Sequence, residues 1–342
     1  MPLLDVGYRQ WEGNRTPRWT RALVLATTGI HLVWKGTWLK RVLMFMAIPA
    51  LIAGIFVATF EQTIDRSGPR EMLRALNQNP QSRSIAARAG VDLSEASADP
   101  EAYRHFTWSY ILFSLSRYPQ AFGMIVVLGL VAARLISYDL RSRGYLLYLS
   151  RPLTPGEYVF GKSLVLFFLL FMMSAVPALL IYVAGLFLST DSTAIAQTWD
   201  IPLRILLASL VLMIPTSAVA LAFSAMTQES RYAGFAWFAM WVVGGVTFYS
   251  LWGATQIGQE IRRPRRGGPN REGPDIEAFN AINSWSSYKL FSPYETLGYL
   301  QQQIFGLTVK DDWTWAPWIL AIIASIVGYG FAYWRVSRVL KA

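Results

Sequence analysis

The sequence predicts an all-α protein that crosses a membrane six times. Of its 342 residues, 54% are hydrophobic and only 15% are charged, whereas about a quarter of the residues are charged in a typical soluble protein. The apolar residues are concentrated in runs of about 20, the length at which a helix crosses the ~30 Å hydrocarbon core of a bilayer. The excess of basic over acidic residues lies in alternate connections between these runs and in the two terminal segments.

Six runs are long enough to be spans. They cover about residues 42–60, 119–136, 163–188, 201–223, 232–252 and 315–334. Pro119, Pro202 and Pro317 stand near the start of a run, where a helix does not need the missing amide hydrogen. Pro49 and Pro215 lie inside runs, which is acceptable because neighbouring helices can satisfy the freed backbone groups.

The N-terminal region, residues 1–41, is predicted to be cytoplasmic and to carry an amphipathic elbow helix over about residues 19–40, ahead of the transmembrane domain at 42–342. Large apolar residues recur there at helical spacing: Trp19, Leu23, Ile30, Trp34 and Trp38. Arg21 and Lys35 lie on another face. A basic helix that carries tryptophan is suited to the membrane surface.

The connections between spans differ in charge. The N-terminal region, the second and fourth connections and the C-terminal tail carry 16 basic and 5 acidic residues, whereas the other three connections carry 14 and 16. Basic residues near span ends favour the cytoplasmic side, so both termini are predicted to be cytoplasmic, in a plasma (bacterial inner) membrane. The net charge of +10 then faces the cytoplasmic leaflet of the lipid bilayer, and no nucleic-acid partner is needed to explain it.

The outer segments, residues 61–118 and 253–314, are too long for simple turns. Each is predicted to contain short helices, because residues 102–117 and 276–305 are rich in aromatic side chains. Arg204 stands just inside the fourth span, and its long side chain is expected to reach the outer interface.

One stretch has a misleading pattern. Residues 156–163, G-E-Y-V-F-G-K-S, satisfy the phosphate-loop expression G-x-x-x-x-G-K-[ST]. That loop needs a preceding strand and backbone amides that surround a phosphate. Thr154, Pro155 and Glu157 instead form the pattern of a helix-capping box, so a helix is predicted to start there and run into the third span. No nucleotide site is predicted.

Metal and catalytic motifs are also missing from the sequence. There is no cysteine, and His31 and His105 are far apart. The sequence predicts no metal site, no catalytic residue and no cofactor bound by this chain.

The segment 137–162 is the most informative part of the chain. It reads as a short amphipathic cytoplasmic helix, a corner marked by Pro152 and a new helix capped by Thr154. From the residues alone, a docking site for a soluble partner and an ordinary basic loop fit equally well.

This segment resembles the connection between spans two and three in permease subunits of type 2 ATP-binding-cassette (ABC-2) exporters. In that family an acidic residue precedes basic and small residues, a hydrophobic patch, S-R-P, an aromatic residue and G-K. The matching residues here are Asp139, Arg141, Arg143, Gly144, Ser150-Arg151-Pro152, Tyr158, Gly161 and Lys162. The layout of elbow helix, six spans and aromatic outer helices is also similar, while the long outer segments depart from it and leave the substrate class open.

The resemblance implies that a separate ATPase subunit, which carries ATP and magnesium, contacts the coupling segment. The implied contact residues are Asp139, Leu140, Arg141, Ser142, Arg143, Gly144, Tyr145, Arg151 and Pro152. Those implied at the start of the third span are Thr154, Glu157, Tyr158, Gly161 and Lys162. Two permease chains, identical or different, would pair and export a substrate by alternating access.

Other classes of protein remain as alternatives. A non-transporting membrane scaffold or assembly factor would act through the large outer segments. An ion-coupled carrier is disfavoured because the centres of the spans have almost no acidic residues. A membrane enzyme is disfavoured because the chain has neither an H-E-x-x-H nor a G-x-S-x-G motif.

Overall fold

A computed structural model describes residues 17, 20–62, 68–93, 103–144, 153–189, 193–262, 286–308 and 314–341. Every regular element in these ranges is a helix. Six helical stretches are long and apolar enough to cross a membrane. The predicted all-α fold with six spans is therefore confirmed.

The helices follow the chain in a simple order. They are α1 (Thr20–Trp34), α2 (Thr37–Gln62), α3 (Gly68–Gln78), α4 (Pro80–Arg88), α5 (Arg104–Leu115), the π-helical turn η1 (Ser116–Gln120), α6 (Ala121–Leu135), α7 (Ser137–Arg141), α9 (Pro155–Met173), α10 (Ala175–Leu188), α11 (Thr193–Thr198), α12 (Ile201–Met226), α13 (Ser230–Arg262), the 3-10 helix η2 (Ser287–Phe291), α15 (Pro293–Ile304) and α16 (Ala316–Lys341).

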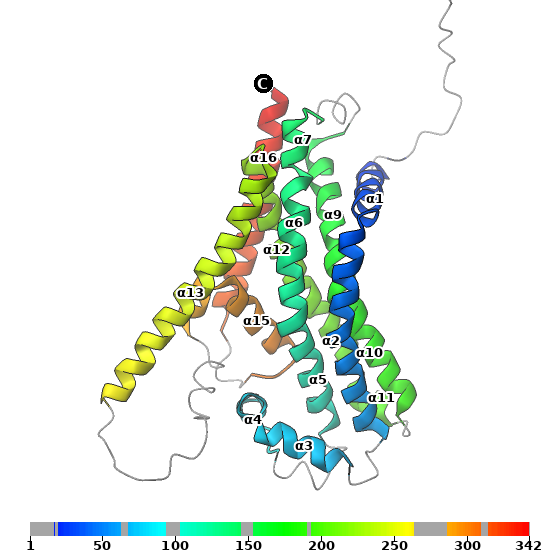
Figure 1. The fold of residues 1–342 in the computed structure, drawn as a ribbon, viewed down its shortest axis with the longest axis vertical. Coiled ribbons are helices and arrows are strands. Elements are labelled where there is room, and N and C mark those ends of the chain that lie inside the picture. Colours follow the sequence, from blue (N-terminus) through cyan, green and yellow to red (C-terminus); the bar gives the residue numbers. More distant parts are fainter. Residues whose placement is uncertain are drawn as a thin grey trace, which may run out of the picture.

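The long helices form an elongated bundle (Figure 1). At one end lie α1, α7 and the end of α16, and we call this the α7 end. At the opposite end α3 and α4 lie across the bundle, and we call this the α4 end. Helix α13 leans away from the other spans toward the α4 end, and the short helix α15 lies inside the bundle between the two ends.

Three spans are central and three are peripheral. The buried share of the most apolar window is 61% for the span of α5 and α6 and for that of α11 and α12, and 50% for that of α9 and α10, but only 17% for α2, α13 and α16. The peripheral helices expose large apolar side chains, among them Leu51, Ile55 and Phe56 of α2, Val242, Val243 and Val246 of α13, and Ile322, Ile323 and Ile326 of α16. Such contiguous apolar surface marks contact with lipid or with another protein.

The second span starts earlier than the predicted residue 119. Helix α5 continues through η1, which contains Pro119, into α6. The aromatic residues 102–117, which were predicted to form a separate short helix, are therefore largely continuous with the second span. Their side chains explain why, because Trp108, Phe113 and Leu112 are almost fully buried within the bundle. This stretch from Arg104 to Arg141 has 38 residues, more than the ~20 needed to cross the hydrocarbon core.

The helix predicted over 19–40 is two helices. The helix is interrupted at Lys35 and Gly36. Figure 1 shows α1 almost end-on, so α1 lies across the direction of the spans. Its buried residues are the small or apolar Ala22, Leu25 and Ala26. This face packs on α9, where a Cβ added to Gly29 would lie 2.7 Å from Cγ2 of Val165.

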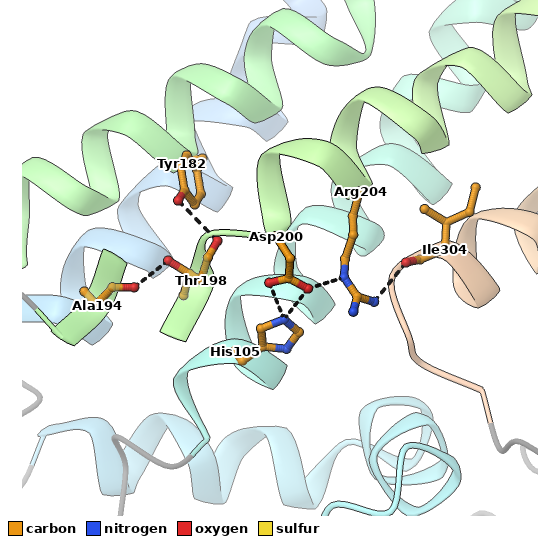
Figure 2. Close-up of polar contacts among 7 residues, drawn as sticks. All are labelled: His105, Tyr182, Ala194, Thr198, Asp200, Arg204 and Ile304. Carbon is orange, nitrogen blue, oxygen red and sulfur yellow. Dashed lines mark hydrogen bonds and ion pairs between the residues drawn. The ribbon is translucent and has the colours of Figure 1, made fainter. Parts of the chain in front are cut away.

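An ion-pair cluster joins three helices toward the α4 end (Figure 2). The Asp200 carboxylate lies 3.0 Å from Nε2 of His105 on α5 and accepts a 2.6 Å hydrogen bond from Nε of Arg204. Arg204 also donates through Nη1 to the carbonyl of Ile304, at the end of α15, at 2.9 Å. Arg204, which was predicted to reach the interface, is therefore engaged in capping α15, whose terminal carbonyls lack helical partners.

Helices α12 and α16 make a backbone contact that yields a prediction. A Cβ added to Gly328 of α16 would lie 2.7 Å from the carbonyl of Ala218, whereas one added to Gly330 would meet nothing within 4 Å. Alanine raises helix propensity by about 1 kcal/mol at both sites, but overpacking costs about 1–3 kcal/mol. We expect Gly328→Ala to lower the melting temperature in detergent, measured by intrinsic fluorescence, and Gly330→Ala not to lower it. Equal shifts would contradict this packing.

Candidate functional site

The candidate site is the α7 corner, which we define as residues 137–144 together with 153–162. It begins where α6 ends and the chain continues into α7. The hydroxyl of Ser224 on α12 accepts hydrogen bonds from the amides of Ile136 at 3.0 Å and Ser137 at 3.1 Å, and donates to the carbonyl of Ala133 at 3.2 Å. Backbone groups at a buried helix break need such partners, so Ser224 ties the start of α7 to α12.

A buried polar triad ties α7 to α9. Oδ2 of Asp139 lies 2.7 Å from Nζ of Lys162 and accepts a 2.6 Å hydrogen bond from the hydroxyl of Tyr158. Asp139, Tyr158 and Lys162 are 9%, 1% and 8% exposed. A charge is buried at acceptable cost only when it is paired and hydrogen-bonded, so α7 is held against α9.

The sequence of α9 explains this geometry. Tyr158 and Lys162 are four residues apart, so both side chains lie on one face of the helix and reach the same carboxylate. The start of α9 is fixed by Thr154, whose hydroxyl accepts from the amide of Glu157 at 3.3 Å, while the Glu157 carboxylate accepts from the amide of Thr154 at 2.7 Å. The predicted capping box is confirmed.

The pattern that mimics a phosphate loop lies within α9. Residues 156–163 are helical, and the amide of Tyr158 bonds to the carbonyl of Thr154 at 3.0 Å. The prediction that this stretch begins the third span is confirmed. Its amides form helical hydrogen bonds and do not surround a phosphate.

The exposed residues of α7 are Tyr138 and Arg141. Ser142 and Arg143, in the turn that follows α7, are exposed as well. Nη1 of Arg141 lies 3.1 Å from Oε2 of Glu229, in the connection between α12 and α13. The backbone of Arg143 has a φ of 52°, a left-handed conformation that is uncommon in residues other than glycine.

Helix α1 also contacts the corner. A Cβ added to Gly161 would lie 2.9 Å from Cδ2 of Leu25 and 3.0 Å from the carbonyl of Ala22. The absence of a side chain at Gly161 therefore lets α1 approach α9 beside Lys162. The corner thus joins α1, α6, α9 and α12.

The structure divides the predicted contact residues into two groups. Leu140 is buried in the core of the bundle, and Gly144 is half-buried. Together with the buried triad, Leu140 and Gly161 position the corner, and the exposed residues of α7 remain accessible. Tyr145, Arg151 and Pro152 lie outside the described residues.

Two partners of the corner, Glu229 and Ser224, were not predicted. Glu229 carried a weak signal, because it is the one acidic residue of the short fourth connection, whose one basic residue is Arg231. Ser224 carried none, since a serine in an apolar span does not reveal which helix it will bond. Among the residues that the structure describes, no group of three or more potential metal ligands is found.

The comparison with known families identifies the family of this chain. The sequence profile of the ABC-2 family transporter proteins matches residues 24–338, from α1 to the end of α16. The chain belongs to the ABC-2 family. No curated protein matches the sequence. The family consists typically of non-catalytic membrane subunits that act with an ATPase subunit, and the six apolar spans agree with a transporter permease.

The buried triad predicts unequal effects of substitution. Removing one partner of a buried ion pair costs about 3–5 kcal/mol, more than removing both. We expect Asp139→Asn to lower the melting temperature in detergent strongly, and Asp139→Asn with Lys162→Gln to recover part of the loss.

The matched control is Arg141→Gln. Its ion pair with Glu229 is exposed, with 63% of the Arg141 side chain accessible, and exposed pairs contribute about 0–1 kcal/mol. If Asp139→Asn and Arg141→Gln shift the melting temperature equally, the triad does not hold the corner.

Proposed function

We propose that this chain is the transmembrane subunit of an ABC exporter and that a separate ATPase subunit docks on the α7 corner. Membership of the ABC-2 family supports the class of transporter. The single observation that supports the docking site is the division within the α7 corner, where the exposed Arg141 and Arg143 follow the buried Asp139 in sequence. An exposed cationic surface on a rigidly held helix suits a soluble partner with complementary charge.

The links of the corner explain how docking could move the spans. Asp139 ties α7 to α9, Ser224 ties it to α12, and Glu229 ties it to the connection that leads into α13. A displacement of α7 by the ATPase therefore acts on three spans at once. Rigid elements joined by hydrogen bonds and ion pairs are the physical means of such coupling.

In this proposal the ATPase binds ATP and magnesium, and the permease contributes the pathway. Two permease chains, identical or different, pair and alternate between states open to either side. The α7 end lies in the cytoplasm with both termini, and the chain spans the bacterial inner membrane. The excess of basic residues in the connections at that end supports this orientation, with the basic side chains against the lipid bilayer and no nucleic acid involved.

Charge reversal on the corner tests the docking site. We expect Arg143→Glu to reduce permease-stimulated ATP hydrolysis by about tenfold, equivalent to about 1.4 kcal/mol of binding free energy, when the chain is reconstituted with an ATPase subunit that the unchanged chain stimulates. The control is Arg83→Glu, an equally exposed arginine on α4, which should leave the stimulation unchanged.

The same preparation separates this proposal from its alternatives. Thermal unfolding of both variants establishes that the fold is intact. A chain that purifies without an ATPase and transports along an ion gradient would contradict the proposal. Stimulation that is insensitive to Arg143→Glu but lost on changes at the α4 end would favour a scaffold that acts through its outer segments.

A further inference from the structure

Helix α15 lies between two open spaces of opposite character. The first, which we call the polar cavity, has a volume of about 310 Å³ and lies between α4, α5, α13 and α15. Its lining includes Arg117, Tyr118, Tyr249, Lys289, Glu295 and Tyr299. The second, the apolar groove, has a volume of about 210 Å³ and lies between α12, α13, α15 and α16. Its lining includes Pro215, Val219, Trp241, Leu297, Ala321 and Ala324.

A third, smaller space of about 20 Å³, which we call the neck, shares walls with both. Arg117, Tyr294 and Gly298 line both the neck and the polar cavity. Trp241 and Leu297 line both the neck and the groove. The polar cavity, the neck and the groove therefore adjoin one another, and we call the three together the path. Its lining changes from polar to apolar across α15.

We propose that this path binds one lipid-like molecule, with its headgroup in the polar cavity and its alkyl chain in the apolar groove. As a statement about the transported substrate, this inference rests on the proposed function. As a statement about binding, it rests on the geometry alone. Small-molecule sites are concave, largely apolar and about 300–1,000 Å³ in volume, which the two spaces together satisfy.

The polar cavity has the chemistry of a headgroup site. Nη2 of Arg117 lies 2.9 Å from Oε2 of Glu295, and its Cζ lies 3.7 Å from the ring centre of Tyr294. Nζ of Lys289 lies 5.1 Å from the ring centre of Tyr299, and Lys289 is only 2% exposed. Arg117 and Lys289 both line the polar cavity, and arginine and lysine side chains are donors suited to phosphate or hydroxyl oxygens.

A local irregularity of the backbone supports the same assignment. Arg117 and Tyr118 stand in the π-helical turn η1, between α5 and α6. Such turns occur frequently at functional sites because they redirect side chains. Here the turn places Arg117 at the neck and Tyr118 at the wall of the polar cavity.

The groove has the chemistry of an alkyl-chain site. The small residues Ala321 and Ala324 of α16 leave space beside Trp241 and Leu297. Its walls include residues 320–324 of α16 and 215–219 of α12, about 6 Å along each helix. The groove therefore has room for the end of an alkyl chain.

Photolabelling of the purified chain tests the proposal. The chain is reconstituted without an ATPase in phosphatidylcholine bilayers that contain a low fraction of a photoactivatable phosphatidylglycerol. The reactive diazirine is placed either on the end of an acyl chain or on the headgroup. We expect the chain-end probe to label peptides around 215–219 and 321–324, and the headgroup probe to label peptides of α4 and α15, as measured by mass spectrometry.

Two pairs of variants make the result decisive. Ala324→Trp fills the groove and should reduce chain-end labelling of α12 at least about threefold, whereas Ile326→Trp, at a site 68% exposed on the same helix, should not. Tyr118→Ala should reduce headgroup labelling, whereas Tyr232→Ala, at a site 61% exposed near the start of α13, should not. The second pair decides the question if Ala324→Trp fails to fold.

The outcomes separate this inference from the proposed function. Equal labelling in Ala324→Trp and Ile326→Trp, or in Tyr118→Ala and Tyr232→Ala, means general contact with bulk lipid and overturns the inference. Competition by unlabelled phosphatidylglycerol, but not by a neutral glycolipid, assigns the headgroup chemistry to phosphate, and the reverse assigns it to a sugar. Failure of an ATPase to dock would contradict the proposed function. It would leave the lipid site intact, because the labelling is measured without an ATPase.

Discussion

The contact between Asp139, Lys162 and Tyr158 is the constraint on which the α7 end depends. Helix α7 has only five residues, far fewer than an isolated helix needs to be stable in water. Its position is therefore set by tertiary contacts. A carboxylate and an ammonium group tolerate burial only together, so α7 cannot separate from α9 without exposing both charges. This makes α7 a firm part of the bundle rather than a mobile loop.

Some basic residues of the outer segments are paired inside the fold. Arg104 and Glu61 form an ion pair that is fully buried, and Arg117 pairs with Glu295 with both side chains at most 10% exposed. At the α7 end Lys162 is paired with Asp139 in the same way, while Arg141 and Arg143 remain exposed. Basic residues of the outer segments are therefore partly neutralised inside the fold, which explains why their number does not conflict with an orientation read from span-end charges.

Local signals made much of the fold predictable. Apolar runs identified all six spans, and Thr154, Pro155 and Glu157 fixed the start of α9, because both features depend on neighbouring residues. The continuity of α5 with α6 was not predictable, since it depends on buried contacts of residues such as Trp108. The partners Ser224 and Glu229 lie about 88 residues from α7 in sequence, and a polar residue does not reveal which distant helix it will meet.

Two helices connect the α7 corner with the spaces around α15. Arg117 stands in η1, directly before α6, and Ser137 starts α7 directly after it. The two residues are 20 positions apart, or about 30 Å along a helix. On α12, Ser224 holds the corner while Pro215 and Thr216 line the apolar groove. A displacement of α7 therefore acts directly on walls of both the polar cavity and the groove. Coupling between the ends then needs only two rigid helices, because the residues that fix the corner and those that line the path belong to the same elements.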